Sequence, residues 1–422
     1  MKTTPLIGLS FSAILSASLC AILSTCLLGA AGSSSSAATY QVERAQPDRL
    51  RIATDRGRDA PATILALRSR DNGIRSQVED AECDGKPLAA KDAGEWQVPA
   101  GCRQLRWSVP LQPSGTSDPN AQRSQRLESG VLLSEASSLP RLGDATAPEY
   151  LQFPAGRVFP YAVAGKLPLP DKGQPFLFAL MGQVPMLETA EQGIGLIYFL
   201  DQRAAKGKVA DMTQHMAGLK WLAARLHKTG PQNFSVLWMG VPQDRLTLSG
   251  QTGTGLLLVN YSAGDGKEMW GSKMRLYVPL HEAVHQMAAS GNRRSAWYDE
   301  SLASYLASRA TLFVSKDDAG AMAMFDRFKA DGKHFESGLI PMDRHVSETG
   351  DVSGFAAFYT KGVAFWDAVN TALAAQGDSL ENYYAALALT KECDNDKLPD
   401  FIQTTLHLPD TVWSTLKKTY LL

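Results

Sequence analysis

The sequence predicts an α+β protein: a β-rich N-terminal domain, sandwich-like, followed by a domain with a small sheet and a mainly helical C-terminal part. Between Tyr40 and about Pro160, short stretches such as Arg103–Val109 alternate polar and apolar residues and end at Gly, Pro, Asn or Asp, as strands and turns do. Beyond Met274 the apolar residues recur at helical spacing. These two patterns place the strands before the helices.

The first 38 residues are expected to be a secretory signal peptide. From Pro5 to Ala38 the chain has no charged residue, and the small residues Ser36–Ala38 offer a cleavage site. The alternative is an uncleaved anchor, because the apolar stretch Leu6–Leu28 is long enough to span a bilayer. Lipid attachment at Cys26 is a weaker alternative. We expect a secreted or periplasmic protein, without stable membrane association if the signal is cleaved.

The rest of the chain is expected to form two domains, residues 39–165 and 166–422. The second contains strand-like runs around one long helix, so a small sheet is expected there, and helices follow. The predicted strands are 176–180, 195–199 and 234–238, and the predicted helices are 209–228, 317–330, 355–375, 380–389 and a final pair containing Phe401 and Trp413.

Composition adds limits. The chain has 422 residues, of which 44% are hydrophobic and 20% charged, with a formal net charge of −1. These are values of an ordinary globular protein that can bury a large core. There is no basic excess, so nucleic acid is not an expected partner. The oligomeric state is not predicted.

Cysteine usage agrees with export. Cys20 and Cys26 lie in the predicted signal, which leaves three cysteines in the mature chain. Cys83 and Cys102 are spaced to close a hairpin by a disulfide in an oxidising compartment. Cys393 is then the odd one, expected to be a buried or unreactive thiol. No cysteine lies near the histidine motif described next, so a thiolate metal ligand is not expected.

Residues 281–285 read His-Glu-Ala-Val-His and are the most informative stretch of the chain. At about 3.6 residues per helical turn, His281 and His285 lie one above the other on a single face, so both imidazoles can bind one metal ion. Glu282 is rotated by about 100° from His281, and its carboxylate can reach a water on the open side of that ion. The pattern predicts a zinc hydrolase site, with a chance match on a buried helix as the alternative.

A second helix is expected to supply the third zinc ligand. It begins near Ala296 and carries Glu300 early, fifteen positions after His285. A turn at Ser290–Asn292 separates the two helices, so they can fold back as an antiparallel hairpin. This arrangement brings Glu300 toward the two histidines.

At these residues the sequence resembles the gluzincin metallopeptidases, in which a His-Glu-x-x-His helix is completed by a glutamate on the following helix. Trp297–Tyr305 is similar to the Trp-Leu-Asn-Glu-Gly-Phe-Ala-x-Tyr segment of the zinc aminopeptidases and leukotriene-hydrolase-like enzymes, with Ser301 in place of the glycine. Tyr359–Val363 resembles their Tyr-Glu-Lys-Gly-Ala segment. The resemblance implies a zincin-like catalytic domain and makes Tyr359 the donor to the oxyanion of the tetrahedral intermediate.

One departure bears on the substrate. The zinc aminopeptidases carry a Gly-x-Met-Glu-Asn strand whose glutamate holds the substrate's free amine, and the corresponding stretch here, Gly255–Asn260, has no acid. This favours cleavage within peptides, with the substrate added to the edge of that strand. Two alternatives stay open: an aminopeptidase whose amine anchor is Asp265 or Glu268, and a non-catalytic binding protein that keeps the zinc fold.

The remaining candidates are weaker. His215 and His227 lie on the predicted helix 209–228 and are expected at the surface. His345 is placed in a polar loop, as a surface residue or a second oxyanion donor. Asp299 either orients a zinc-bound histidine or is a charge favoured at a helix N-terminus.

Together these observations predict an exported, zinc-dependent metallopeptidase that acts on peptides or proteins. His281, His285 and Glu300 are the expected Zn²⁺ ligands, and Glu282 is the expected general base.

Overall fold

The computed structural model describes residues 37–69, 74–115, 122–145, 148–160, 165–171, 173–201, 209–241, 249–262, 271–288, 295–316 and 318–422. The leader through residue 36 lies outside them, so its cleavage, its role as an anchor, the lipid at Cys26 and export all stay predictions. Within the described ranges, no helix combines the length and the apolar character that a bilayer crossing requires.

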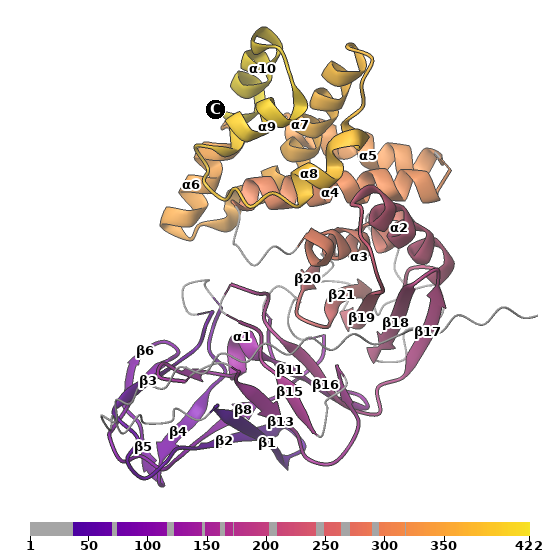
Figure 1. Cartoon of the computed structure of the whole chain (residues 1–422). Helices are drawn as coiled ribbons and strands as arrows, with labels where there is room; N and C mark the ends of the chain where they lie inside the picture. Colours follow the sequence, from indigo (N-terminus) through magenta and orange to yellow (C-terminus); the bar gives the residue numbers. More distant parts are fainter. Residues whose placement is uncertain are drawn as a thin grey trace, which may run out of the picture. The chain divides into compact units, whose positions relative to one another are not determined.

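Three sheets form the β-rich N-terminal part (Figure 1). The seven-stranded sheet has the order β15 (Lys166–Pro168), β13 (Tyr150–Gln152), β1 (Thr39–Gln46), β2 (Arg49–Asp55), β8 (Gln104–Pro110), β4 (Glu79–Cys83), β5 (Lys86–Pro87). The four-stranded sheet has the order β12 (Arg141–Leu142), β3 (Thr63–Ala66), β7 (Glu95–Val98), β6 (Ala90–Asp92). The five-stranded sheet has the order β14 (Val158–Phe159), β16 (Phe178–Gly182), β11 (Gly130–Ser134), β10 (Gln125–Leu127), β9 (Gln112–Pro113), and the short helix α1 (Glu135–Ser138) follows β11.

These sheets share one hydrophobic core, which is why the strands form where the sequence alternates. Ile52 and Trp107 enter the core from the seven-stranded sheet, Val98 from the four-stranded sheet and Val131 from the five-stranded sheet. Side chains of successive strand residues point to opposite faces, so one face of each sheet is buried here. The predicted β-rich N-terminal part is confirmed.

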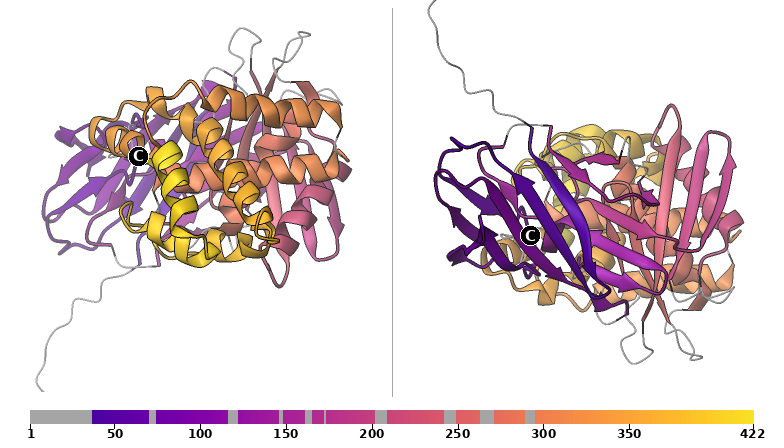
Figure 2. Two further views of the ribbon diagram at one scale, coloured as in Figure 1. Left: turned by 90° about the horizontal axis from the view of Figure 1, so that it is seen from above. Right: turned by 90° about the horizontal axis from the view of Figure 1, so that it is seen from below.

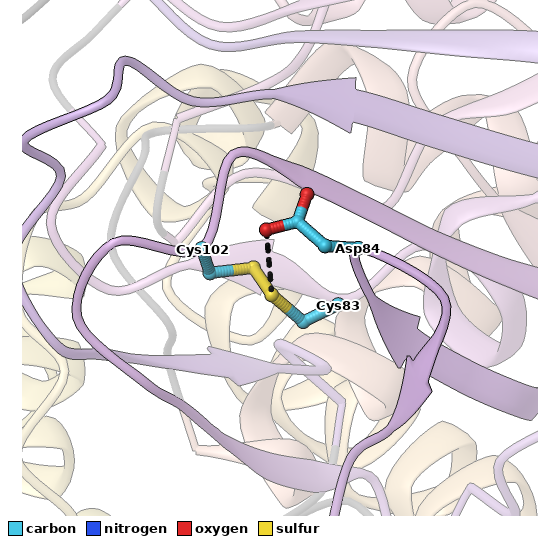
Figure 3. A group of neighbouring side chains, drawn as sticks. All are labelled: Cys83, Asp84 and Cys102. Carbon is cyan, nitrogen blue, oxygen red and sulfur yellow. Dashed lines mark hydrogen bonds between the residues drawn. A yellow bond between two sulfur atoms is a disulfide. The ribbon is translucent and has the colours of Figure 1, made fainter.

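The Cys83–Cys102 disulfide is present, as the cysteine spacing predicts (Figure 3). It joins the end of β4 to the residues before β8, two strands that also pair antiparallel. Asp84 lies beside it, and its carboxylate accepts hydrogen bonds from the backbone N–H groups of Arg103 and Gln104 at 3.1 and 3.0 Å. Those hydrogen bonds, the one from Arg103 first, lower the pKa of Asp84. Because both sulfurs are bonded to each other, this cluster offers no thiolate to a metal.

A second five-stranded sheet lies against the helices and has the order β17 (Met186–Glu191), β18 (Ile194–Leu200), β19 (Gln232–Val241), β21 (Leu257–Ser262), β20 (Gly250–Thr252). The three inner strands are parallel, and β17 and β20 pair antiparallel at its two ends. Helix α2 (Met212–Arg225) connects β18 to β19. The small predicted sheet is therefore present, with β18 and β19 among its strands.

The predicted strand at residues 176–180 lies in another sheet, so its expected membership of this small sheet is wrong. The structure has β16 at Phe178–Gly182, paired antiparallel with β11 and β14. Its apolar residues fill buried space on both faces, so periodicity does not reveal which sheet the strand joins. The boundary predicted at residue 165 stays a prediction, although β15 and β16, which follow it, pair with strands that precede it.

Beyond residue 271 the described chain is helical, as predicted. In Figure 2 the helices coloured orange to yellow form a cluster of their own. The α-helices are α3 (Gly271–Ala288), α4 (Ala296–Val314), α5 (Ala319–Gly332), α6 (Leu339–Thr349), α7 (Ala356–Ala374), α8 (Tyr384–Ala388), α9 (Leu398–Leu406) and α10 (Asp410–Leu416). Two short 3₁₀ helices, η5 (Val352–Gly354) and η6 (Leu380–Tyr383), and the π-helix η7 (Lys417–Leu421) accompany them.

Helices α4 and α7 approach closely because a glycine faces a serine between them. A Cβ added to Gly362 on α7 would lie 2.3 Å from the Cβ of Ser301 on α4. The Ser301 hydroxyl also accepts a hydrogen bond from the indole N–H of Trp366 at 2.9 Å. This contact fixes how near α7, which carries Tyr359, comes to α4, which carries Glu300.

We predict that Gly362→Ala destabilises the protein by about 1 to 3 kcal/mol, because the added methyl group forces the two helices apart. Urea unfolding monitored by circular dichroism measures the change. Gly57→Ala is the matched control, because a Cβ at Gly57 meets nothing within 4 Å. Equal urea midpoints for the two variants would show that the helices accommodate the added methyl group without loss of stability.

Candidate metal centre

Helix α3 presents the histidine motif on the edge of a buried helix. Ala283 and Val284 pack in the core, whereas His281 and Glu282 are 5% and 6% exposed and point toward polar neighbours. His285 lies one turn after His281 on the same face, as the spacing predicts. The apolar residues bury the helix, and the motif residues are left facing α4 and β20.

The structure brings His281, His285 and Glu300 together. The Nε2 atoms of the two histidines are 3.0 Å apart. Oε2 of Glu300, near the start of α4, is 3.1 Å from Nε2 of His281 and 3.4 Å from Nε2 of His285. The connecting residues 289–294, where a turn is predicted, lie outside the described residues.

This triangle of donor atoms fits a zinc ion. With ligand bonds of about 2.0 to 2.1 Å and tetrahedral angles, two ligand atoms lie about 3.3 Å apart. The three observed separations, 3.0, 3.1 and 3.4 Å, are close to that edge length. Two imidazoles and one carboxylate also form a ligand set that zinc prefers and that leaves a fourth position open.

A serine supports the first histidine. The hydroxyl of Ser304, one turn after Glu300 on α4, is 3.3 Å from Nδ1 of His281 and fully buried. In the tautomer with the proton on Nδ1, the Nδ1–H group donates a hydrogen bond to the Ser304 hydroxyl. Nε2 is then unprotonated, and its lone pair is free to bind a metal ion held by the three donor atoms. Sequence reasoning missed Ser304, although its spacing of four from Glu300 places both on one face of α4.

The charges within the triangle are strongly coupled. Burial by itself lowers the pKa of His285, but the charge of Glu300 and its hydrogen bond outweigh burial and raise the pKa to about 9. Burial raises the pKa of Glu300, and the two histidines more than offset it, so that this pKa is well below its usual range. Asp299 also raises the pKa of His285 through its charge, and it lies in the first turn of α4, so both hypotheses for Asp299 remain.

Glu282 is held from the side of the sheet. The hydroxyl of Thr252 on β20 donates to Oε2 of Glu282 at 2.7 Å. Gly250 makes room for the other oxygen, since a Cβ there would lie 2.6 Å from Oε1. Burial raises the pKa of Glu282, with the two histidines acting in the opposite direction. A carboxyl group with a raised pKa is suited to exchange protons near neutral pH.

The strand beside the motif is β20, and the prediction that the strand at residues 255–260 offers its edge is wrong. β21 covers most of those residues and pairs on both sides, with β19 and with β20. Residues 250–252 contain two polar side chains and a glycine, so they lack the apolar signal by which strands are found. Thr252 was missed for that reason.

Tyr359 faces the same centre from α7. Its ring centroid is 5.6 Å from that of His281, and its pKa is raised well above the usual value by burial, by the charges of Glu300 and Glu282 and by a hydrogen bond to Glu300. The phenol is therefore neutral and can donate a hydrogen bond. Tyr277, also buried, has its ring centroid 5.9 Å from that of His281, with the two planes inclined by 42°.

Three weaker predictions are corrected. His215 is fully buried rather than at the surface, with Nδ1 2.8 Å from the hydroxyl of Tyr198, because it points from α2 onto β18. Cys393 is exposed, so the expectation of a buried thiol is wrong and that of an unreactive one stays a prediction. His345 lies on helix α6 and not in a loop, and its imidazole is 3.5 Å from the carboxylate of Asp351 and more than half exposed.

The remaining candidate residues have different outcomes. His227 is exposed, as expected. Asp265 and Glu268, the possible amine anchors, lie outside the described residues.

We predict that Ser304→Ala weakens zinc binding about 10- to 100-fold, because His281 loses the partner that orients its ring. Competition with a chelator of known affinity measures the dissociation constant. Ser308→Ala is the matched control, since Ser308 is equally buried on α4 but its hydroxyl has no hydrogen-bond partner among the described residues. Equal affinities in the two variants would remove Ser304 from the site.

Zinc affinity is expected to rise with pH up to about 9, the pKa of His285. Below that pH the metal-free protein carries a proton on His285, which the ion must displace, so affinity falls by up to about tenfold per pH unit as pH decreases. Equilibrium titration with cobalt(II) as a spectroscopic probe checks the slope between pH 6 and 8. A flat profile would contradict this ligand set.

No protein-family model matches the chain, and no curated protein matches it by sequence. Solved structures do. An aminopeptidase N family protein from Idiomarina loihiensis superposes with a TM-score of 0.60 at 15% identity, over 91% of this chain and 73% of that chain. An M1 zinc metallopeptidase from Deinococcus radiodurans has a TM-score of 0.53 at 15% identity, over 91% of this chain and 93% of that chain.

A mutant of the Deinococcus radiodurans protein, bound to a Tyr-Ser-Ala substrate, has a TM-score of 0.53 at 16% identity, over 91% of this chain and 92% of that chain. At identities this low, the superpositions establish the fold alone. The α+β fold predicted from the sequence is confirmed, and it is the fold of the M1 zinc metallopeptidases.

Proposed function

We propose that the protein is a zinc-dependent metallopeptidase. The observation that carries the proposal is the triangle of His281, His285 and Glu300 donor atoms, with sides of 3.0 to 3.4 Å, beside the buried carboxylate of Glu282. The fold shared with the M1 zinc metallopeptidases supports it independently. His281, His285 and Glu300 would hold the ion.

When bound, zinc lowers the pKa of a coordinated water toward neutrality and polarises the substrate carbonyl. Glu282 accepts the proton as the water attacks and then transfers it to the leaving amine. The hydrogen bond from Thr252 fixes the carboxylate during both transfers.

Tyr359 donates its neutral O–H to the oxyanion that develops on the carbonyl oxygen. Its hydrogen bond to Glu300 and its position beside His281 place it at the centre without making it a ligand. Donors of this kind contribute about 2.7 to 4 kcal/mol to transition-state stabilisation.

We further propose that the enzyme cleaves within peptides. β20 ends the sheet beside Glu282, and an extended substrate can add to it as a further strand. Residues 249–262, which include β20 and β21, have no acidic side chain that would bind a free amine. Export through the predicted signal peptide would expose such an enzyme to extracellular or periplasmic peptides.

Aminopeptidase activity is the second candidate. It is favoured by the names of the structures to which the chain is similar, one of them an aminopeptidase N family protein. It would require a carboxylate near the substrate amine, supplied from outside residues 249–262. A non-catalytic zinc-binding protein is the remaining alternative, and the two experiments below separate all three.

Glu282→Gln is expected to bind zinc normally and to lose about 10²- to 10⁴-fold in kcat, because the base is removed while the ligands stay. Metal content and hydrolysis of a peptide library measure the two effects. Glu188→Gln, which removes an exposed carboxylate from β17, is the matched control for the loss of one negative charge. Unchanged turnover in Glu282→Gln would reject the mechanism, and a wild-type chain without turnover would favour the binding protein.

The two peptidase candidates differ in how they treat a blocked amino terminus. We expect an acetylated peptide to be cut at the same internal bonds as its free-amine form, because no amine anchor is required. Mass spectrometry of the fragments identifies the bonds. Release of single amino-terminal residues from the free-amine peptide alone would establish the aminopeptidase instead.

A further inference from the structure

A cavity of about 570 Å³ lies on the far end of α4 from the metal centre. It is lined by residues of α2, α4, α5 and η6, and Arg309 on its wall is nine residues beyond Glu300, about 14 Å along the helix. Cavities of this size accommodate small ligands or one to two residues of a peptide. The proposed peptidase mechanism uses none of its residues.

One wall of the cavity is apolar and unusually exposed. Phe313 is 57% exposed and Met322 is 38% exposed, although both are large hydrophobic side chains. The ring of Phe313 is 6.0 Å from that of Trp221, and the two planes are inclined by 31°. An apolar side chain from a ligand would cover surface that water now contacts, which is favourable.

The other wall carries an unbalanced positive charge. Glu381 forms an ion pair with Arg225 at 3.0 Å, and Arg225 also lies over the face of Trp221 at 5.5 Å. Arg309 is 3.9 Å from the same carboxylate, which is too far for a hydrogen bond. Among the described residues that line the cavity, two guanidinium groups therefore face one carboxylate, and the excess of one charge suits a monoanion.

We propose that this cavity binds the carboxyl terminus of a peptide whose last residue is aromatic or a large aliphatic one. Arg309 pairs with the terminal carboxylate, for which the planar guanidinium offers two parallel donors. Phe313, Met322 and Trp221 cover the side chain. In a terminal residue the carboxylate and the side chain are attached to the same Cα. The basic and apolar walls adjoin in the same cavity, so one residue can contact both. The site goes beyond the proposed function, because peptide binding here does not require catalysis.

The test is calorimetric titration of the zinc-loaded full chain with Glu282→Gln, in which a peptide would not be cut. The probes are acetyl-Gly-Gly-Phe with a free carboxylate, its carboxamide, and acetyl-Gly-Gly-Gly with a free carboxylate. Only the first is expected to bind well, with each of the others at least about tenfold weaker, since each lacks one of the two recognised groups.

Variants locate the binding. Arg309→Gln and Phe313→Ser are each expected to weaken binding of the first probe about tenfold. Arg327→Gln is the matched control, an exposed arginine on α5 that pairs with Asp331 and does not line the cavity. Binding that survives both cavity variants comes from elsewhere, such as the metal centre, and overturns the proposal.

Two further results would also overturn it. Equal affinity for the free acid and the carboxamide would show that the arginines do not recognise a carboxylate. Self-association of the wild-type chain that Phe313→Ser abolishes, without peptide binding, would assign the surface to a second copy of the protein. Neither result bears on turnover, so the failure of this proposal and of the peptidase mechanism are distinguishable.

Discussion

The mutual approach of three electron-rich atoms is the constraint on which the site depends. Nε2 of His281, Nε2 of His285 and Oε2 of Glu300 lie within 3.4 Å of one another in a largely buried setting. Lone pairs held this close repel unless a proton or a cation is shared among them. The raised pKa of His285 is the response of the metal-free protein, and a divalent ion satisfies all three atoms at once. The surrounding fold serves to keep α3 and α4 at this separation.

That separation is maintained by buried contacts around α4. At its start, the backbone N–H of Trp297 donates to Asp343 on α6 at 3.3 Å, and the indole N–H donates to Asn395 at 2.7 Å. On its flank, Gly362 admits α7 against Ser301. Glu300 is thus on a helix that α6 and α7 fix near its start, on either side of the metal ligand along the chain.

Local spacing was sufficient to predict part of this structure. The i, i+4 histidines, Glu300 on the next helix and the Cys83–Cys102 bond follow from distances along the chain, and the structure brings each set together. What depends on partners distant in sequence was not predictable. Thr252 lies on a short polar strand, and His215 is buried by pairing with Tyr198. Helix α6 has few apolar residues, because only one side of it is covered, so it resembles a loop.

Strand β19 is buried on both faces, and this determines how the two halves of the chain depend on each other. Trp238 packs toward the helices, whereas Leu237 and Met239 pack with Leu132 of β11 and Phe178 of β16. A shortened chain that began after β16 would expose a leucine-rich surface to solvent, and such surfaces aggregate. The half that carries the metal centre is therefore not a portable module: gene fusions and shortened recombinant chains have to carry the β-rich half along with it.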